Sequence, residues 1–255
     1  MNVKDCIAVV TGGASGLGEA TVRSLAHDGA RVAILDVQED KGAALAKELG
    51  ENVIFVKTDI TNGDDTQDAI NKIIDSFGGI SVVVNCAGVA DPGKLLGKKG
   101  PLSLAHFNKV IQINLVGTVN VTRLAADQMI KNTPNEDGEK GVVINTASAA
   151  AYDGQIGQVA YSASKAGVAG MTLPLARECA AYGIRVMTIA PGIFMTPMIA
   201  VMPEAVQESL SRMVPFPQRL GKPTEYAQLV KHIIENPMLN GEVIRLDGAI
   251  RMAAK

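Results

Sequence analysis

The chain has 255 residues, of which 47% are hydrophobic and 20% are charged, and its formal net charge at pH 7 is −2. This length and apolar fraction suit one globular domain over residues 1–255 with a well-buried core. The weak negative charge provides no basic field for nucleic acid or an anionic membrane, so neither is expected as a partner, and no apolar stretch approaches transmembrane length.

The cysteines and the first residues bear on location. Cys6, Cys86 and Cys179 are odd in number and have neither metal-ligand nor C-x-x-C spacing, which favours a reducing compartment and predicts no metal site. Only residues 1–5 precede the first apolar run, too few for a secretory signal peptide. We therefore expect a cytoplasmic protein, in preference to one of the mitochondrial matrix.

Short runs rich in Val and Ile alternate with helical patterns along the chain. The runs lack polar alternation, as is typical of parallel strands that are buried on both faces. The predicted strands are 6–11, 31–36, 53–59, 81–85, 141–148, 185–191 and 242–246. The predicted helices lie near 17–28, 39–49, 64–77, 104–131, 159–182 and 223–235. This order predicts an α/β fold: a Rossmann-like, doubly wound parallel sheet of about seven strands with helices on both faces.

The first predicted strand runs directly into "TGGASGLG", residues 11–18, and then into a helix. Such a turn points backbone N–H groups and a helix N-terminus at a dinucleotide pyrophosphate. A tight turn that binds nothing would read the same, but the position in the first βα turn favours the nucleotide. The expected contacts are Gly12, Ser15, Gly16, Leu17 and Gly18.

The second predicted strand ends at Asp36, about twenty residues after the glycines. A carboxylate here can accept hydrogen bonds from both ribose hydroxyls and would repel a 2′-phosphate. Residues 12–18 contain no Arg or Lys, and Val37 and Gln38 follow the carboxylate. NAD is therefore expected rather than NADP. After the third strand, Asp59 and Ile60 could meet the adenine edge, although a helix N-cap explains that segment nearly as well.

Six motifs follow one another at suitable spacings over nearly the whole chain, and together they resemble the short-chain dehydrogenase/reductase family. They are "TGGASGLG", "NCAG" (85–88), "NLVG" (114–117), Ser148, "YSASK" (161–165) and "PGIFMT" (191–196). The second departs from the family's usual N-N-A-G because it contains Cys86. The resemblance implies an oxidoreductase that transfers hydride between a secondary alcohol or ketone and a nicotinamide.

Tyr161 and Lys165 lie four residues apart, which places them on one face of a helix. An ammonium about 4 Å from a phenol, at an effective dielectric near 20, would stabilise phenolate by roughly 4 kcal/mol. That energy would lower the phenol's pKa from about 10 to about 7. We expect Tyr161 to be the general acid/base of the reaction.

The resemblance assigns further catalytic roles. Ser148, near the end of the fifth strand, is expected to hold the substrate oxygen. Lys165 would also bond the nicotinamide ribose. Asn114 would kink its helix and hold a water that links Lys165 to solvent, and a hydrogen-bonded core amide is the alternative.

The remaining contacts come from three segments. Gln155 and Gln158 lie between Ser148 and Tyr161 and are expected to touch substrate. The other expected cofactor contacts, besides Tyr161 and Lys165, are Cys86, Ala87, Gly88, Pro191, Ile193, Phe194 and Thr196, the last for the carboxamide. A segment containing Met195, Met198, Met202 and Met213 could close over substrate as a lid, with ordinary core packing equally compatible.

The segments on the substrate side resemble family members that act on 3-hydroxyacyl-CoA. We therefore expect oxidation of 3-hydroxyacyl-CoA to 3-oxoacyl-CoA, with side activity on hydroxysteroids. The alternatives are a 3-oxoacyl-thioester reductase, a hydroxysteroid or polyol dehydrogenase, and a non-catalytic NAD-binding scaffold. The combination of Asn114, Ser148, Tyr161 and Lys165 argues against the scaffold, because binding alone needs no such set.

Two features concern the partners. Lys94, Lys98 and Lys99 lie in an insertion at 91–102 and could pair with phosphates of coenzyme A, although a solvated basic loop is the more common explanation. The resemblance implies a homotetramer, in which Ile250, Met252 and Ala253 could cross a subunit interface.

Overall fold

The predicted strands form one parallel sheet in the computed structural model, which describes residues 1–98 and 100–254 apart from the side chain of Met198. The strands of this sheet are β1 (Ile7–Thr11), β2 (Arg31–Asp36), β3 (Val53–Lys57), β4 (Val82–Asn85), β7 (Gly141–Thr146), β8 (Ile184–Pro191) and β9 (Val243–Leu246). Their order is β3-β2-β1-β4-β7-β8-β9, and all neighbours are parallel. The predicted doubly wound sheet is confirmed.

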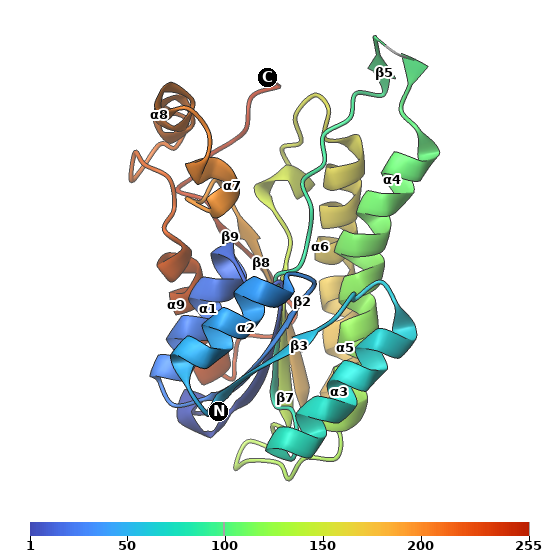
Figure 1. Cartoon of the computed structure of the whole chain (residues 1–255), viewed down its shortest axis with the longest axis vertical. Coiled ribbons are helices and arrows are strands. Elements are labelled where there is room, and N and C mark those ends of the chain that lie inside the picture. Colours follow the sequence, from blue (N-terminus) through green and yellow to red (C-terminus); the bar gives the residue numbers. More distant parts are fainter. Residues whose placement is uncertain (99, 255) are drawn as a thin grey trace.

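Helices cover both faces of the sheet (Figure 1). They are α1 (Gly16–His27), α2 (Glu39–Leu49), α3 (Gly63–Phe77), α4 (Leu104–Ile111), α5 (Gly117–Met129), α6 (Val159–Ala180), α7 (Pro197–Ala200), α8 (Glu204–Arg212) and α9 (Pro223–Glu235). Shorter elements are the 3₁₀ turns η1 (Val3–Asp5) and η3 (Ala149–Ala151), the π turn η2 (Gln112–Val116), and the antiparallel pair β5 (Leu96–Gly97) and β6 (Gly100–Pro101). Helices α1, α2 and α9 pack on one face, and α3, α5 and α6 pack on the other.

Successive residues of the central strands point to opposite faces, and both faces are core. In β1, Val10 packs with the cluster under α1 and α9, while Val9 packs with the cluster under α3 and α5. Val84 and Val83 of β4 divide in the same way. All four side chains are completely buried. This two-sided burial is why the strands show continuous Val and Ile rather than polar alternation.

The position of β1 determines where a ligand can enter. It lies between β2 and β4, so the connections that leave these strands diverge to opposite faces of the sheet. Such a reversal of strand order opens a crevice beyond the carboxyl ends of the strands. The glycine turn after β1 and the segment after β4 lie at this crevice.

Several predicted boundaries differ by one or two residues, and two of the differences bear on the site. The strand predicted at 141–148 ends at Thr146, and Ser148 instead caps η3, with its Oγ accepting from the Ala150 N–H at 3.1 Å. The helix predicted at 104–131 is α4 and α5 joined through the π turn η2. A π turn adds a residue to one helical turn and is not marked by any change in apolar spacing.

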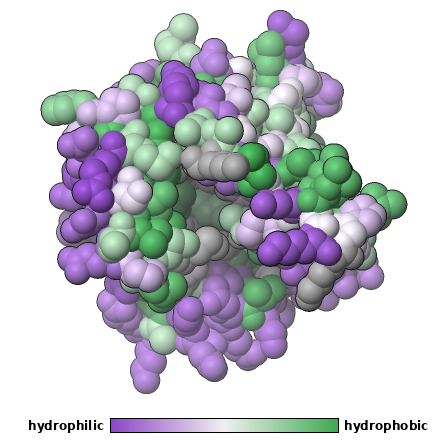
Figure 2. Space-filling view, turned by 90° about the horizontal axis from the view of Figure 1, so that it is seen from above, coloured by the Kyte–Doolittle hydropathy of each residue, from purple (hydrophilic) through white to green (hydrophobic). Residues whose placement is uncertain are grey.

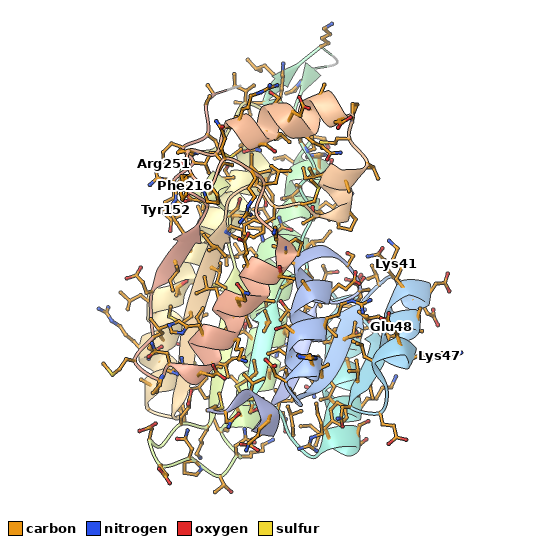
Figure 3. All side chains as sticks on the ribbon, turned by 90° about the vertical axis from the view of Figure 1, so that its left-hand side faces the viewer. Lys41, Lys47, Glu48, Tyr152, Phe216 and Arg251 are labelled. Carbon is orange, nitrogen blue, oxygen red and sulfur yellow. The ribbon has the colours of Figure 1, made fainter. Side chains whose placement is uncertain are left out.

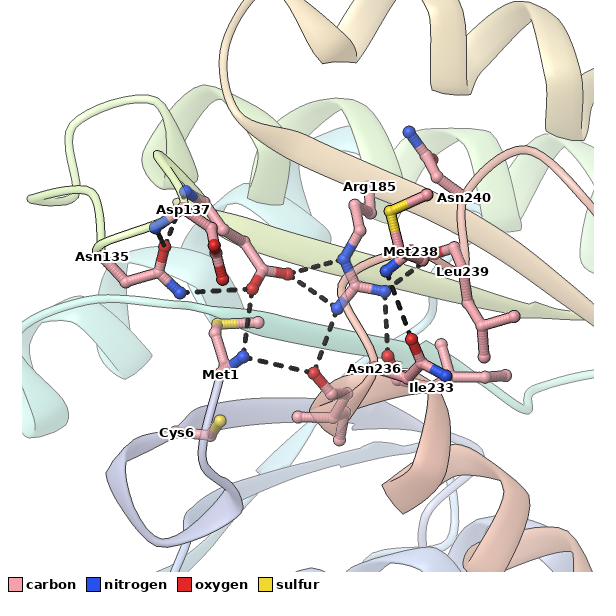
Figure 4. Close-up of polar contacts among 12 residues, drawn as sticks. Met1, Cys6, Asn135, Asp137, Arg185, Ile233, Asn236, Met238, Leu239 and Asn240 are labelled. Carbon is pink, nitrogen blue, oxygen red and sulfur yellow. Dashed lines mark hydrogen bonds and ion pairs between the residues drawn. The ribbon is translucent and has the colours of Figure 1, made fainter.

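A buried ion cluster joins the chain at the amino edge of the sheet (Figure 4). Arg185 of β8 donates from Nε to Glu139 at 2.7 Å, and its Nη atoms donate to the carbonyls of Ile233, Ile234 and Leu239 at 2.8–3.0 Å. Glu139 also accepts from the Met1 amine at 3.1 Å. The guanidinium thereby satisfies the carbonyls of Ile233 and Ile234 in the last turn of α9, which have no partner inside the helix, and the Leu239 carbonyl beyond it.

We expect Arg185→Met to lower the free energy of unfolding by about 3–5 kcal/mol, because it removes the guanidinium from the buried Glu139 carboxylate and leaves three carbonyls without their donor. Urea unfolding followed by circular dichroism measures the loss. Arg23→Met is the control, since its pairs with Glu19 and Glu48 lie at the surface and should contribute little. Equal losses for the two variants would contradict the assigned role of the buried cluster.

Candidate active site

A cavity of about 1040 Å³ lies beyond the carboxyl ends of the strands. Figure 2 looks onto this side and shows the hollow near the centre of the molecule. Every cofactor and substrate contact predicted from the sequence lines the cavity, and Asn114 lies behind its wall. The topology thus brings together residues from Gly12 to Thr196 at one crevice.

The glycine turn is shaped by close packing as well as by backbone conformation. Gly12 has φ +62°, and a Cβ there would lie 2.7 Å from the Ala87 nitrogen. A Cβ on Gly18 would lie 2.2 Å from the Gly12 carbonyl oxygen, which no side chain can tolerate. The helix α1 begins at Gly16 with its N-terminus at the cavity. A cradle of this form fits a pyrophosphate.

Asp36 connects β2 to the glycine turn. The residue is 7% exposed, and its carboxylate accepts from the Ala14 N–H at 3.1 Å and from the Gln38 N–H at 3.0 Å. Both neighbouring wall residues, Val37 and Gln38, are uncharged. Two backbone N–H groups, those of Ala14 and Gln38, therefore hold the carboxylate in place at the cavity wall.

Asp59 forms a turn of its own. Its side chain accepts from the N–H and the hydroxyl of Thr61 at 2.9 Å and 2.8 Å. The cap of α3 is Asn62, which accepts from the N–H groups of Asp64 and Asp65. The alternative that Asp59 is a helix cap is therefore wrong, and the residue remains in the cavity wall beside Ile60.

The helix α6 carries Tyr161 and Lys165 on its cavity side. The Lys165 side chain is buried, and its Nζ lies 6.0 Å from the centroid of the Tyr161 ring. The same ammonium donates to the Thr146 carbonyl at 2.7 Å. Ser148 lines the cavity beside Tyr161. The sequence motif had not identified Thr146, because a backbone acceptor can be any residue type.

Burial controls the protonation of both residues of this pair. It raises the pKa of Tyr161 above its ordinary value, and a hydrogen bond with Ser148 acts in the opposite direction. It lowers the pKa of Lys165 to about 8, with the nearby Cys86 thiol opposing it. The expectation that Lys165 brings the pKa of Tyr161 to about 7 is therefore wrong for the protein groups alone. Burial of the phenol outweighs the Ser148 hydrogen bond, and Lys165, with its pKa lowered to about 8, loses its charge before the phenol titrates.

Asn114 is a fully buried amide within η2. Its Oδ1 accepts from the Val89 N–H at 2.8 Å, and its Nδ2 donates to the Val89 carbonyl at 2.9 Å and to Ser164 Oγ at 3.0 Å. These bonds secure the segment after β4 against α6. The side chain is thus a hydrogen-bonded core amide, which was the alternative considered from the sequence. Its place in a π turn agrees with the expected kink in the helix.

Several residues of the cavity wall were not predicted. Ile199, Val206 and Leu210 come from α7 and α8, and Met252 comes from the C-terminal tail. Met202 of the predicted lid lines the cavity with them. Among the other lid methionines, Met195 is partly exposed and the side chain of Met198 lies outside the described residues. The apolar residues at helical spacing in α8 were the sequence signal that could have predicted this part of the wall.

The C-terminal tail and the insertion depart from expectation in part. Ile250 is completely buried in its own chain, so its predicted place in a subunit interface is wrong. The Ala253 carbonyl instead accepts from the Gln155 amide at 3.1 Å. In the insertion, Lys94 and Lys98 are exposed and do not line the cavity, and Lys99 lies outside the described residues.

Comparison with known proteins agrees with this geometry. A family profile described as short chain dehydrogenase matches residues 6–207. The chain is 55% identical over 252 residues to "3-hydroxyacyl-CoA dehydrogenase type-2" of Drosophila melanogaster, a match that covers 98% of this chain and 99% of the relative. The human protein of the same name is 54% identical, with 98% and 97% covered.

The chain belongs to the short-chain dehydrogenase family of oxidoreductases. A crystal structure of 3-hydroxyacyl-CoA dehydrogenase type-2 from Mycobacterium avium is also similar, with a TM-score of 0.94 and 44% identity over 97% of this chain and 96% of that one. Within the part of the chain that the structure describes, no helix has the length and apolar character needed to cross a membrane.

The lowered pKa of Lys165 has a consequence for stability. Between about pH 8 and the ordinary lysine pKa, the unfolded chain binds a proton that the folded chain has lost, so wild-type stability rises with pH in this window. Below it, the folded protein holds a buried ammonium. We therefore expect Lys165→Met to be more stable than wild type by about 1–3 kcal/mol at neutral pH, with the difference shrinking above about pH 8.

Urea unfolding at several values between about pH 6 and pH 9 measures this difference. Lys131→Met, at an exposed pair with Asp127, controls for loss of a lysine without burial and should show no such pH dependence. A Lys165→Met variant that is less stable than wild type by the same amount throughout would contradict the assignment.

Proposed function

We propose that this chain is an NAD-dependent dehydrogenase that interconverts 3-hydroxyacyl-CoA and 3-oxoacyl-CoA, with Tyr161 as the general acid/base. The observation that carries the proposal is the shared cavity, which the glycine turn, Asp36 and the residues Ser148, Tyr161 and Lys165 all line. The names of the relatives and their similarity over nearly the whole chain support the substrate class.

The residues present fit a nicotinamide dinucleotide. The turn at 12–18 would hold the pyrophosphate, and Asp36 would accept hydrogen bonds from the adenosine ribose. Ile193 and Thr196 would contact the nicotinamide end. NAD is proposed over NADP because a fixed carboxylate with uncharged neighbours repels a 2′-phosphate.

The chain's own residues would handle the proton. When bound, the oxidised nicotinamide supplies the hydride acceptor and a positive charge close to the phenol. Tyr161 would take the proton of the substrate hydroxyl, and Ser148 would donate a hydrogen bond to the substrate oxygen as the carbonyl forms. Lys165 would keep a positive charge in place against the burial that raises the pKa of Tyr161. In the reverse direction, Tyr161 would return the proton.

The apolar part of the cavity suits an acyl chain. Met202 lies just before α8, Val206 and Leu210 lie one helical turn apart within it, and Met252 adds a flexible thioether from the tail. The exposed Lys94 and Lys98 in the insertion are proposed to attract the phosphates of coenzyme A from outside the cavity. A solvated basic loop remains the alternative for these lysines.

We also propose a cytoplasmic homotetramer that functions in fatty acid metabolism. The tetramer is supported by a group of exposed side chains on the side of the molecule that carries the C-terminal tail (Figure 3). Tyr152 is 52% exposed and Phe216 is 82% exposed, and the backbone of Phe216 bonds that of Gly248. Large exposed aromatic side chains of this kind are typical of surfaces that another chain covers.

Tyr161→Phe tests the proposed chemistry. It removes the hydroxyl that exchanges the proton and keeps the ring, so we expect kcat for 3-hydroxybutyryl-CoA oxidation to fall by at least about 10³-fold. The affinity for NADH, measured by fluorescence titration, should change little, because the glycine turn and Asp36 are intact.

The assay follows NADH absorbance, and the same reaction with NADP⁺ should be much slower. Tyr182→Phe is the matched control, since this tyrosine is 57% exposed and does not line the cavity. Full activity of Tyr161→Phe would remove the residue from the mechanism. A wild-type protein that binds NADH and turns over neither hydroxyacyl-CoA, hydroxysteroid nor polyol would instead favour the scaffold alternative.

A further inference from the structure

Three polar side chains meet at the cavity wall, which two of them, Cys86 and Thr146, help to line. Cys86 follows β4, Thr146 ends β7, and Tyr226 lies in α9 with no exposed surface. The Tyr226 phenol oxygen is 2.7 Å from Thr146 Oγ1 and 3.6 Å from Cys86 Sγ, and the last pair, Thr146 Oγ1 and Cys86 Sγ, is 3.8 Å apart. The general mechanism above uses none of these three side chains.

The geometry gives the hydrogen bonds one consistent direction. The Cys86 thiol donates to the Tyr226 oxygen, and the Thr146 hydroxyl donates to the Cys86 sulfur. The remaining contact is then a donation from the Tyr226 hydroxyl to Thr146 Oγ1. Each group gives one hydrogen bond and receives one, so the three form a closed ring. Such rings strengthen their members mutually in a dry environment.

Thr146 belongs to this ring and also to the active site. Its side chain joins the ring on the face of the sheet that α9 covers, while its carbonyl accepts from Lys165 Nζ at 2.7 Å. Lys165 arrives from α6, on the opposite face. The same Nζ lies close to Gly88, where an added Cβ would come within 3.4 Å of it.

The other groups around Lys165 offer no comparable anchor. Tyr161, on the same helix, presents the face of its ring at 6.0 Å from Nζ to centroid. Asn114 from η2 is committed to Val89 and Ser164. Cys86 is the titratable neighbour from the segment after β4, and it is a ring member. The position of the Thr146 peptide therefore sets the position of the ammonium.

We propose that Tyr226 is a positioning residue, which holds Thr146 through the hydrogen-bonded ring and thereby fixes Lys165 beside Tyr161. The effect on catalysis rests on the proposed function, whereas the effect on Lys165 itself does not. Tyr226 lies 80 residues from Thr146 in the sequence and does not itself line the cavity.

Tyr226→Phe tests the proposal because it removes the ring hydroxyl and keeps the packing of the aromatic ring. The first readout is the pKa of Lys165 in the full chain without substrate, measured by ¹⁵Nζ NMR titration, with the resonance assigned by its loss in Lys165→Met. A less well held Thr146 carbonyl is a poorer acceptor, so this pKa should fall by about half a unit to one unit from its value of about 8.

The second readout is the pH profile of kcat/KM for alcohol oxidation. When the ammonium is less well placed, it favours the Tyr161 phenolate less. The acidic limb of the kcat/KM profile should therefore move to higher pH, while the pKa of Lys165 moves to lower pH. Thr172→Val is the matched control, because it also removes a buried hydroxyl, one bonded to Thr188 at 2.6 Å on α6 and β8. Neither readout should change in the control.

A purely structural role for Tyr226 predicts a lower melting temperature with both readouts unchanged, and that result would overturn the proposal. If Tyr226→Phe fails to fold, Thr146→Val breaks the same ring while keeping the carbonyl, and it should shift the pKa of Lys165 in the same direction. An unshifted pKa there would also overturn it. Because the NMR titration needs no turnover, failure of the proposed reaction would leave this test intact.

Discussion

A positive charge held out of water beside a phenol is the constraint on which the rest of the site depends. Lys165 is 5% exposed, and its ammonium is positioned by the Thr146 carbonyl. Keeping an ammonium in such a place costs stability, as its lowered pKa records. The surrounding core is large enough to carry that cost, because strands of the central sheet are buried on both faces. The buried charge is therefore kept at the expense of local stability.

The fold places this charge where a cofactor and a substrate could meet it. The divergence of the chain on either side of β1 opens the crevice, and the glycine turn lets the backbone of α1 approach it closely. On the far side, α6 crosses the same edge and brings Tyr161 and Lys165 to it. Asn114 and Ser164 then secure the wall between them. Each of these elements is common in parallel sheets. The site forms because all of them meet at the carboxyl ends of the strands.

The sequence was sufficient for the sheet and for most of the cavity wall. Continuous Val and Ile runs predict strands buried on both faces, and the glycine turn, Asp36 and the Tyr161–Lys165 spacing are local patterns. The partners of Lys165 and Asn114 could not be predicted in this way, because they are the backbone groups of Thr146 and Val89. The Tyr226 contact joins distant segments, and the π turn at Asn114 leaves no mark in the apolar pattern. Helical spacing also states that two side chains share a face without giving the distance between charge and phenol, which is why the pKa of Tyr161 was predicted in the wrong direction.

The most direct measurement is an ultraviolet difference titration of Tyr161, with Tyr161→Phe subtracted, in the protein alone and in its NAD⁺ complex. The account predicts that phenolate forms above the ordinary tyrosine pKa of about 10 in the protein alone, because Lys165, with a pKa of about 8, has lost its charge before the phenol titrates. In the complex it should form below that pKa, because the positive charge of the nicotinamide brings phenolate formation into the range in which Lys165 still holds its proton. The account also predicts that Lys165→Met weakens the lowering. A phenolate that titrates above about 10 in both states, or in the complex at the same pH with and without Lys165, would contradict it.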